Sequence, residues 1–288
     1  MQVSRGAVSC IILVVAALTI FVWQGVLAHT DQSLRVSILD VGQGDSILIQ
    51  GPTGIQMLID GGPDRSVLRK LALEMGILDR SIDMVVETHP DKDHIAGLPG
   101  VFSKYGVSYF MSPGIPNDTA VTLTLNDSVL RETKAKSFIA RKDMRIHLGG
   151  GAYADVLYPD RDVSKGETNA GSIAMRVVYG DTSFLFTGDL ASEQENYLIR
   201  QYSAEEIESD VLKAGHHGSR HSTSVAWLGQ VRPSIVAISA GKENTYGHPS
   251  PEVLERIHAE GAKIYSTIDS GTIRFVSDGT SIQTKTER

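Results

Sequence analysis

The chain carries, at residues 88–97, the sequence Thr88-His89-Pro90-Asp91-Lys92-Asp93-His94-Ile95-Ala96-Gly97. This stretch follows residues 82–86, which are apolar except for Asp83 and are predicted to form a strand. Imidazole nitrogens and carboxylate oxygens are donors that zinc and manganese accept in proteins. Because a strand opens into a loop here, side chains 89 and 91 point the same way, and side chains 93 and 94 follow on the turn. A solvated acidic turn is the alternative, but two histidines and two aspartates in so short a stretch predict a metal site.

Two more aspartates end apolar stretches in the same manner. Asp60 follows residues 57–59, and Asp189 follows the stretch that begins at residue 183. A carboxylate at the tip of a buried strand is poorly solvated, and this favours a nearby cation. For either residue alone, an ordinary turn aspartate beside glycine is the alternative. Together with the histidine-rich stretch, both become candidates for one metal site.

Histidines also occur in two glycine-containing turns. His216 and His217 lie between glycines after an apolar stretch, and Lys213 precedes them. Adjacent histidines in such a turn ligate a metal ion or bind an anionic oxygen, and Lys213 would add a positive charge. His248 is held in a loop between a glycine and a proline. We expect the histidines without such neighbours to lie at the surface, and these are His29, His147 and His258.

The apolar pattern predicts hairpins first and alternating strands and helices afterwards. This order indicates layered sheets with helices outside. No linker or repeat interrupts it, so we expect one domain over residues 34–278 and a polar C-terminal tail over residues 279–288. The predicted strands are 34–39, 46–50, 55–59, 82–86, 173–179, 183–187, 208–213, 234–239, 263–267 and 272–276. The predicted helices are 66–75, 191–202, 222–229 and 251–260.

Composition excludes several classes of protein. The chain has 288 residues, 41% of them apolar and 21% charged, and this balance is unlike that of a disordered chain. A single cysteine excludes a disulfide scaffold and a cysteine-rich zinc module. The net charge of −7 argues against a protein that coats nucleic acid through net charge alone.

The N-terminal segment, residues 1–28, departs from this average. Residues 7–28 carry no charge, so the segment is predicted to be a membrane anchor or a signal peptide cleaved after Ala28. Arg5 before it favours an N-terminus inside the cell. If uncleaved, the segment attaches the protein to a membrane as a hydrophobic helix. In either case we expect a membrane-anchored or secreted protein with its catalytic domain on the extracytoplasmic side.

The ordered set of motifs resembles the metallo-β-lactamase superfamily, and more narrowly the hydrolase domain of the ComEC-type competence proteins. The resemblance covers residues 34–278, nearly all of the chain after the N-terminal segment. The motifs that carry it are the stretch 89–94, Thr187-Gly188-Asp189, Lys213-Ala214-Gly215-His216-His217-Gly218-Ser219, Tyr246-Gly247-His248-Pro249, Leu39-Asp40-Val41-Gly42-Gln43-Gly44-Asp45-Ser46, Leu58-Ile59-Asp60-Gly61-Gly62 and Thr168-Asn169-Ala170-Gly171-Ser172.

The resemblance implies an α/β fold, a four-layer αββα sandwich with a metal site at one rim. It also implies one or two divalent ions, zinc or manganese. In the superfamily pattern, His89 and Asp91 would serve the first metal position, Asp93 and His94 the second, and Asp189 both. His248 would be the remaining ligand of the second position.

The resemblance further implies residues around these ligands. His216 and His217 would line the site and hold a substrate phosphate, although one of them is an alternative metal ligand. Behind the ligands we expect a supporting shell made of Asp60, Asp40, Asp45 and Asn169.

Two departures from the superfamily pattern affect the first metal position. The superfamily usually has histidine where this chain has Asp91, but the ComEC branch shares this aspartate. The superfamily also has a histidine between the metal-binding stretch and the bridging acid, and His147, the only one in that interval, has an unpersuasive setting. The first position is therefore rich in oxygen donors, which favours manganese more than the usual site does.

The predicted reaction is hydrolysis of a phosphodiester. A divalent ion makes hydroxide available near neutral pH, and Asp93 would orient this nucleophile. The predicted catalytic residues are Asp93, His94, His216, His217 and Lys213. The resemblance implies DNA as the substrate, and a basic stretch at residues 131–145 offers weak independent support. No protein partner is inferred from the sequence.

Two alternatives stay open at this point. The first is a different metallo-hydrolase, acting on a small phosphodiester, a choline phosphoester or a lactam. The second is a metal-stabilised DNA-binding module without turnover, and the missing histidine of the first metal position motivates it.

Overall fold

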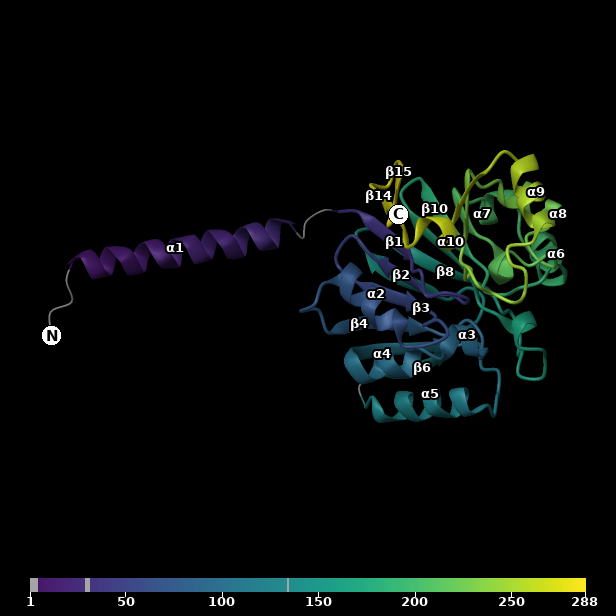
Figure 1. Ribbon diagram of the computed structural model, residues 1–288, viewed down its shortest axis with the longest axis horizontal. Helices are drawn as coiled ribbons and strands as arrows, with labels where there is room; N and C mark the ends of the chain where they lie inside the picture. Colours follow the sequence, from purple (N-terminus) through teal and green to yellow (C-terminus); the bar gives the residue numbers. More distant parts are fainter. Residues whose placement is uncertain (1–4, 29–31, 134) are drawn as a thin grey trace.

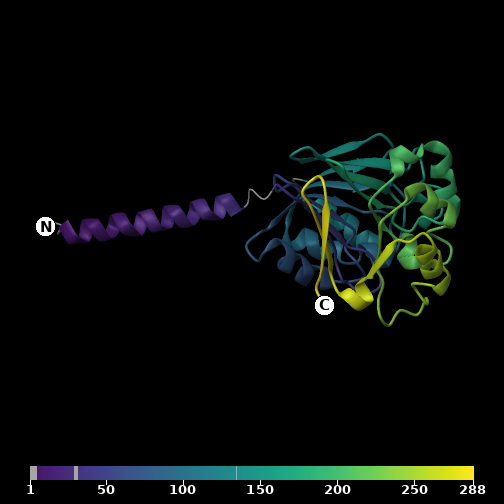
Figure 2. The same cartoon turned by 90° about the horizontal axis from the view of Figure 1, so that it is seen from above.

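The computed structural model describes residues 5–28, 32–133 and 135–288. Two β-sheets face each other over most of the chain, and helices cover the outer face of each sheet (Figures 1 and 2). The predicted four-layer sandwich is therefore confirmed. His29 and Lys134, which took part in the sequence predictions, lie outside the described residues.

The first sheet has eight strands and changes from antiparallel to parallel pairing in the middle. Pairing is antiparallel from β15 to β3 and parallel from β3 to β6. In spatial order the strands are β15 (Ile282–Thr286), β14 (Ile273–Ser277), β1 (Leu34–Ile38), β2 (Ile47–Gln50), β3 (Gln56–Ile59), β4 (Ser81–Val86), β5 (Gly106–Ser112) and β6 (Lys136–Ile139).

The second sheet has seven strands and the same mixed character. Its first four strands pair in parallel, and the others pair antiparallel. Their spatial order is β13 (Lys263–Ser266), β12 (Ile235–Ile238), β11 (Val211–Lys213), β10 (Thr182–Phe186), β9 (Ala174–Tyr179), β8 (Ala152–Tyr158) and β7 (Arg145–Gly149).

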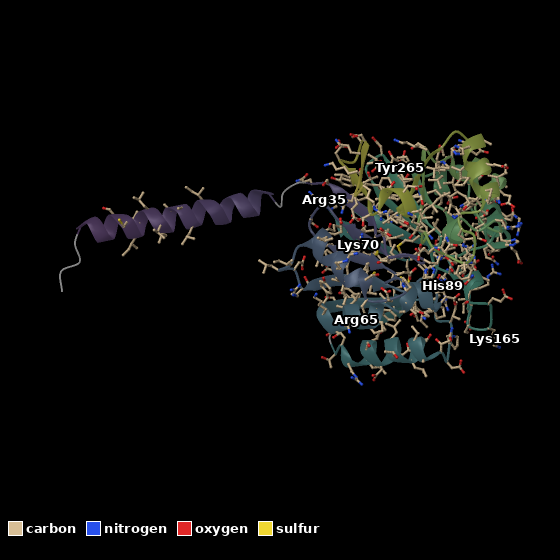
Figure 3. All side chains as sticks on the ribbon, in the orientation of Figure 1. Arg35, Arg65, Lys70, His89, Lys165 and Tyr265 are labelled. Carbon is tan, nitrogen blue, oxygen red and sulfur yellow. The ribbon has the colours of Figure 1, made fainter. Side chains whose placement is uncertain are left out.

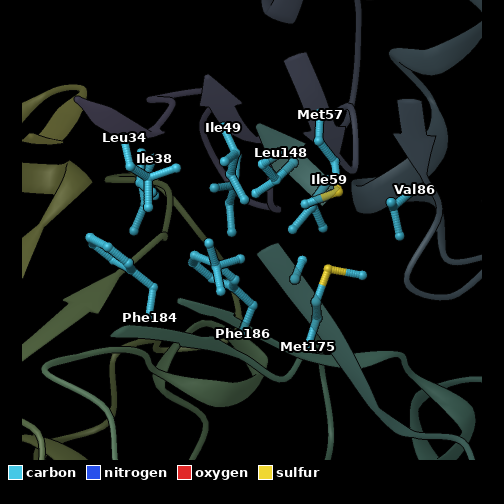
Figure 4. Close-up of a cluster of buried hydrophobic side chains, with 14 of the residues drawn as sticks. Leu34, Ile38, Ile49, Met57, Ile59, Val86, Leu148, Met175, Phe184 and Phe186 are labelled. Carbon is cyan, nitrogen blue, oxygen red and sulfur yellow. The ribbon is translucent and has the colours of Figure 1, made fainter. Parts of the chain in front are cut away.

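The main hydrophobic core lies between the two sheets. Leu34 and Ile38 of β1 face Phe184 and Phe186 of β10 across the interface, and none of these side chains is more than 2% exposed (Figure 4). Alternate residues of a strand share one face, which explains the spacing of four between Leu34 and Ile38 and of two between Phe184 and Phe186. Each such side chain contributes about 1.5–3 kcal/mol by its burial, and this core holds the rim of the sandwich rigid.

Helices cover the outer faces in two groups. On the first sheet lie α2 (Ser66–Met75), α4 (Leu98–Lys104) and α5 (Ala120–Arg131), over a core of their own. On the second lie α6 (Ser192–Gln201), α8 (Val225–Val231) and α9 (Pro251–Ala259). The short elements are α3 (Lys92–Ile95), α7 (Ala204–Ile207), α10 (Thr267–Ser270) and the single turns η1 (Asn169–Gly171) and η2 (Gly215–Gly218).

The boundary predicted at residue 278 is wrong, because the C-terminal residues belong to the first sheet. Strand β15 pairs with β14 over five residues. Beyond it, Glu287 accepts a hydrogen bond from Lys70 of α2 at 2.7 Å, and Arg288 contacts Asp40 at 2.7 Å. The segment is polar because β15 is an edge strand with largely exposed side chains, so its composition resembles that of a tail.

The N-terminal segment forms helix α1 (Arg5–Ala28), which extends away from the sandwich (Figures 1 and 2). Within the described part of the chain, no helix meets the length and apolar character needed to cross a bilayer. The predicted membrane anchor is therefore not supported. Cleavage as a signal peptide and an extracytoplasmic location stay predictions.

Candidate metal centre

The candidate site lies at the rim where several strands end. Strands β3 and β4 are parallel neighbours in one sheet, and β10, β11 and β12 are parallel neighbours in the other. Because the carboxyl ends of parallel strands meet at one edge, the loops that follow them converge. The candidate histidines and aspartates lie in these loops, and the label of His89, which is completely buried, marks this part of the molecule (Figure 3).

The loop after β4 folds the histidine-rich stretch into a compact turn. Asp91 precedes the short helix α3, and its carbonyl accepts hydrogen bonds from the backbone N–H groups of His94 and Ile95. This turn carries His94 inward, so that the rings of His89 and His94 are both fully buried with their centroids 4.1 Å apart. Asp91 and Asp93 stay partly open to solvent. The four side chains therefore lie together, as the sequence spacing predicts.

Asp60 orients His94 from behind. Its carboxylate lies 2.8 Å from His94 Nδ1 and accepts hydrogen bonds from the backbone N–H and the hydroxyl of Thr88. Its backbone is left-handed, with φ of 58°, a strained conformation for a residue other than glycine. Burial raises the pKa of Asp60, against the pull of His94. The contact leaves the opposite nitrogen of His94 to face the site.

Asp189 lies at the centre of the site, among four histidines. Its carboxylate is 3.9 Å from His89, 3.4 Å from His94 and 3.5 Å from both His216 and His217. Burial by itself raises the pKa of Asp189, but His217 and His94 outweigh it and hold the pKa well below its usual range. Asp189 therefore lies among histidines of both predicted metal positions, and its bridging of two ions stays a prediction.

His216 and His217 form a left-handed turn between two glycines. Their φ values are 46° and 55°, and both rings reach Asp189 because of this unusual backbone. Nε2 of His217 is 3.3 Å from Asp93, and Nδ1 is 3.1 Å from the carbonyl oxygen of Ser239. Burial lowers the pKa of His217, but Asp189 and Asp45 outweigh it and raise the pKa to about 9.

His217 lies closer to Asp93 and His94 than the sequence analysis expected, while the place of His248 as a metal ligand stays a prediction, supported by its buried Nδ1 without a hydrogen-bond partner. The ring of His248 lies farther out, with its centroid 5.5 Å from that of His216 and 6.5 Å from that of His217. Burial and the neighbouring His216 lower the pKa of His248 to about 4. The sequence analysis preferred His248 to His217 as a ligand, because the left-handed turn that aims His217 inward has no signature in the sequence.

Lys213 was predicted to be a catalytic residue that adds a positive charge near the substrate. Instead, its side chain is completely buried and its ammonium group is bonded to Asp45. The other carboxylate oxygen of Asp45 is 3.2 Å from Nδ1 of His217. Burial raises the pKa of Asp45, but Lys213 and His217 outweigh it and lower the pKa below its usual range. A chain of contacts thus runs from Lys213 through Asp45 to His217.

Asp40 and Asn169, also expected in the supporting shell, make their side-chain contacts with residues other than the candidate ligands. Asp40 is bonded to Arg288 and lies 3.9 Å from Lys70, at the junction of α2 with the C-terminal residues. Asn169 lies on the turn η1, where its side chain accepts a hydrogen bond from Thr168. Both residues belong to motifs that carry the family resemblance, but their observed side-chain contacts stabilise the surrounding fold. His147 and His258 are exposed, as predicted.

The basic stretch at residues 131–145 is partly neutralised by its own neighbours. Arg131 is paired with Asp127 at 2.6 Å, and Arg145 is paired with Asp155 at 2.6 Å. Arg141 donates hydrogen bonds to backbone carbonyl groups. The stretch therefore presents less free positive charge than its sequence indicates.

Gly44 places the loop after β1 directly against the metal-binding turn. A Cβ atom at Gly44 would lie 2.0 Å from the carbonyl oxygen of Asp93, and φ is 126°. We expect Gly44→Ala to lower stability by roughly 1–3 kcal/mol more than Gly42→Ala, where φ is also positive but no atom lies within 4 Å. Thermal unfolding of the two variants measures this difference, and equal melting temperatures would contradict it.

The donor set fits a divalent cation. Nε2 of His89 and Oδ1 of Asp189 are buried without a hydrogen-bond partner, although buried polar atoms are normally satisfied. Burial is the main reason that the pKa of His89 falls to about 3, so its ring is neutral, which is the form that binds metals. Among the described residues, the donor atoms of Asp45, His94, Asp189 and His217 lie within 4.8 Å of one another, a grouping that could hold a metal ion.

A family model described as the metallo-β-lactamase superfamily matches residues 39–242. The chain belongs to this superfamily. The match includes the stretch 89–94, Asp189 and the histidine pair of η2, so the residues gathered at the rim lie within the part that defines the family. The alternative of a metal-free acidic turn, raised for residues 88–97, is not retained.

Curated relatives include competence proteins. ComE operon protein 3 of Bacillus subtilis (strain 168) is 28% identical over 264 residues, which cover 84% of this chain and 33% of that protein. Recombination protein 2 of Haemophilus influenzae is 30% identical over 259 residues, which cover 86% of this chain and 30% of that protein. The chain thus spans about a third of the length of these relatives, in agreement with a ComEC-type hydrolase domain.

Solved structures show the same fold. Igni18, a metallo hydrolase of Ignicoccus hospitalis, is 16% identical with a TM-score of 0.53, and the similarity covers 84% of this chain and 98% of that one. At this level of identity, the similarity bears on the fold alone. It agrees with the two facing sheets and their outer helices.

Proposed function

We propose that this metallo-hydrolase cleaves phosphodiester bonds, and that its substrate is DNA. The observation that carries the proposal is the pair of donor groups that share Asp189. One group comprises His89, Asp91 and His216, and the other comprises Asp93, His94 and His217; each of the four histidines lies within 4 Å of Asp189. Two ions held in this way suit a reaction in which one oxygen attacks phosphorus and another leaves.

The residues of the site would have three roles, which are metal binding, orientation of the histidine ligands and proton transfer. Asp189 and the histidines would hold the ions, manganese or zinc, which act as Lewis acids on a phosphoryl oxygen and make hydroxide available near neutral pH. Asp60 and Asp45 would fix the orientation of His94 and His217 through their Nδ1 atoms. Asp93, whose carboxylate reaches both His217 and solvent, would accept a proton from the attacking water.

DNA is favoured as the substrate by the relatives and by the openness of the site. One relative is named a recombination protein, and another, from Neisseria gonorrhoeae, is named a competence protein. Three candidate ligands remain accessible to a polymer at the rim, since the side chains of Asp91, Asp93 and His216 are each about a third exposed. We further propose that the enzyme acts outside the cytoplasm, as the charge-free N-terminal segment predicts.

One experiment separates the proposed activity from hydrolysis of other substrates and from metal binding without turnover. The full chain is stripped of metal with a chelator, reloaded with manganese or zinc, and assayed on single-stranded DNA, bis(p-nitrophenyl) phosphate, a choline phosphoester and a lactam. We expect cleavage of DNA and of the small phosphodiester, lost after stripping and restored by metal. Cleavage of only the choline ester or the lactam would overturn the proposal. Stoichiometric metal binding without any turnover would support a binding module instead.

A further inference from the structure

The loop between β12 and α9 is braced by one side chain, Asn244. Its amide nitrogen donates to the carbonyl groups of Gly241 and His248, at 2.7 and 2.6 Å. Its amide oxygen accepts from the backbone N–H groups of Tyr246 and His248, at 3.2 and 3.0 Å. These four bonds fix the backbone on either side of Tyr246, so the position of this residue is set by the fold.

The same loop is tied to the floor of the site. The N–H of Gly241 donates to the side chain of Gln43 at 3.1 Å, in the loop that also carries Asp45. A Cβ atom at Gly218 would lie 2.7 Å from Cβ of Pro249, so the loop also packs against the turn that holds the histidine pair. The loop therefore cannot shift without moving residues of the metal centre.

Aromatic rings lead from this loop to the centre of the site. The ring of Tyr246 is stacked on that of His248, with centroids 5.8 Å apart and planes at 25°. The ring of His248 in turn meets that of His216 edge-on at 5.5 Å, and His216 lies 3.5 Å from Asp189. Tyr246 itself is 70% exposed. A large aromatic side chain is thus held open to solvent one ring beyond the metal-binding histidines.

We infer that Tyr246 is a stacking platform for the nucleobase next to the phosphate that is cleaved. This inference rests on the proposed function and deepens it. Bases stack on exposed aromatic rings in single-stranded nucleic acid complexes without regard to sequence, because every base has a π-face. The ring of His248 supports the platform from one side through its stacking on Tyr246. Tyr246 therefore selects nucleic acid over phosphodiesters that lack a base.

The test compares two single-stranded oligonucleotides of equal length, one ordinary and one in which abasic residues flank the cleaved phosphates. We expect Tyr246→Ala to raise KM for the ordinary oligonucleotide about 5- to 150-fold, the range of one lost stack. Tyr246→Phe and Tyr246→Trp keep an aromatic ring and should stay close to the parent enzyme. For the abasic oligonucleotide, all four proteins should share one KM.

A matched control is Tyr109→Ala, which removes a partly exposed aromatic ring on β5, outside the site. It should leave both KM values unchanged. An equal loss by Tyr246→Ala on both oligonucleotides, or no loss on either, would overturn the stacking inference while leaving the proposed function intact. If the parent enzyme cleaves neither oligonucleotide, the proposed function falls, and the stacking inference falls with it.

Discussion

Replacing Asp189 with asparagine is expected to remove both metal binding and cleavage. Asp189 is the one carboxylate within 4 Å of histidines from both donor groups in the described structure. Changes to residues behind metal ligands already weaken metal affinity 10- to 100-fold, so we expect the loss here to exceed about 100-fold. Titration of the metal-stripped protein with manganese or zinc, followed by calorimetry, measures it directly.

The matched control for this variant is Asp181→Asn. Asp181 directly precedes β10, at the end of the strand opposite to Asp189, and is exposed. The Asp181→Asn variant should therefore bind metal with the affinity of the parent protein. Circular dichroism checks that both variants keep the fold. If Asp189→Asn bound two ions with the parent affinity, the assignment of Asp189 as the shared ligand would be wrong.

Replacing Lys213 with methionine is expected to be the most destabilising change outside the ligands. The variant leaves Asp45 buried at 2% exposure without its cation. Removing one partner of a buried ion pair costs about 3–5 kcal/mol, because the other charge stays unsolvated. It also frees Asp45 from its fixed place beside His217, so metal affinity should fall together with stability. Chemical denaturation of the metal-stripped protein isolates the first effect.

Two further variants separate a buried charge from a general loss of packing. In Lys213→Met with Asp45→Asn, no unpaired charge remains, so the double variant should regain part of the lost stability. Lys70→Met removes another buried lysine, but its partner Glu287 is 32% exposed and can be solvated, so the loss should be smaller. Equal losses in all three proteins would contradict the role assigned to the Lys213–Asp45 pair.

The sequence predicts much of the fold and the centre of the site for identifiable reasons. Helix α2 is predicted at residues 66–75 because its apolar side chains recur on one face, and the structure has it there. Strand β10 and the second half of β4 are buried, so each ends in a short run of apolar residues. The acids and histidines directly after these ends meet because parallel strands carry them to one edge.

Other features depend on contacts that no local pattern encodes. Residues 98–158 form α4, β5, α5 and β6–β8, and their half-exposed strands lack strong periodicity, so they were not predicted. The inward aim of His217 requires a left-handed backbone that only the folded turn imposes. Lys213 sits in the motif as a catalytic cation would, but its position on the buried strand β11 turns it toward Asp45. No sequence pattern indicated the role of Asn244, whose side chain forms the hydrogen bonds that hold the loop of Tyr246.

The central claim is that this chain uses the donor groups around Asp189 to hydrolyse phosphodiester bonds with a divalent metal ion. The most direct measurement is the initial rate at which the purified full chain cleaves single-stranded DNA, followed as manganese is added to metal-stripped protein. The account predicts a rate that rises from zero, saturates with metal, and is absent in Asp189→Asn. Cleavage that persists in the stripped protein, or in Asp189→Asn, would contradict it.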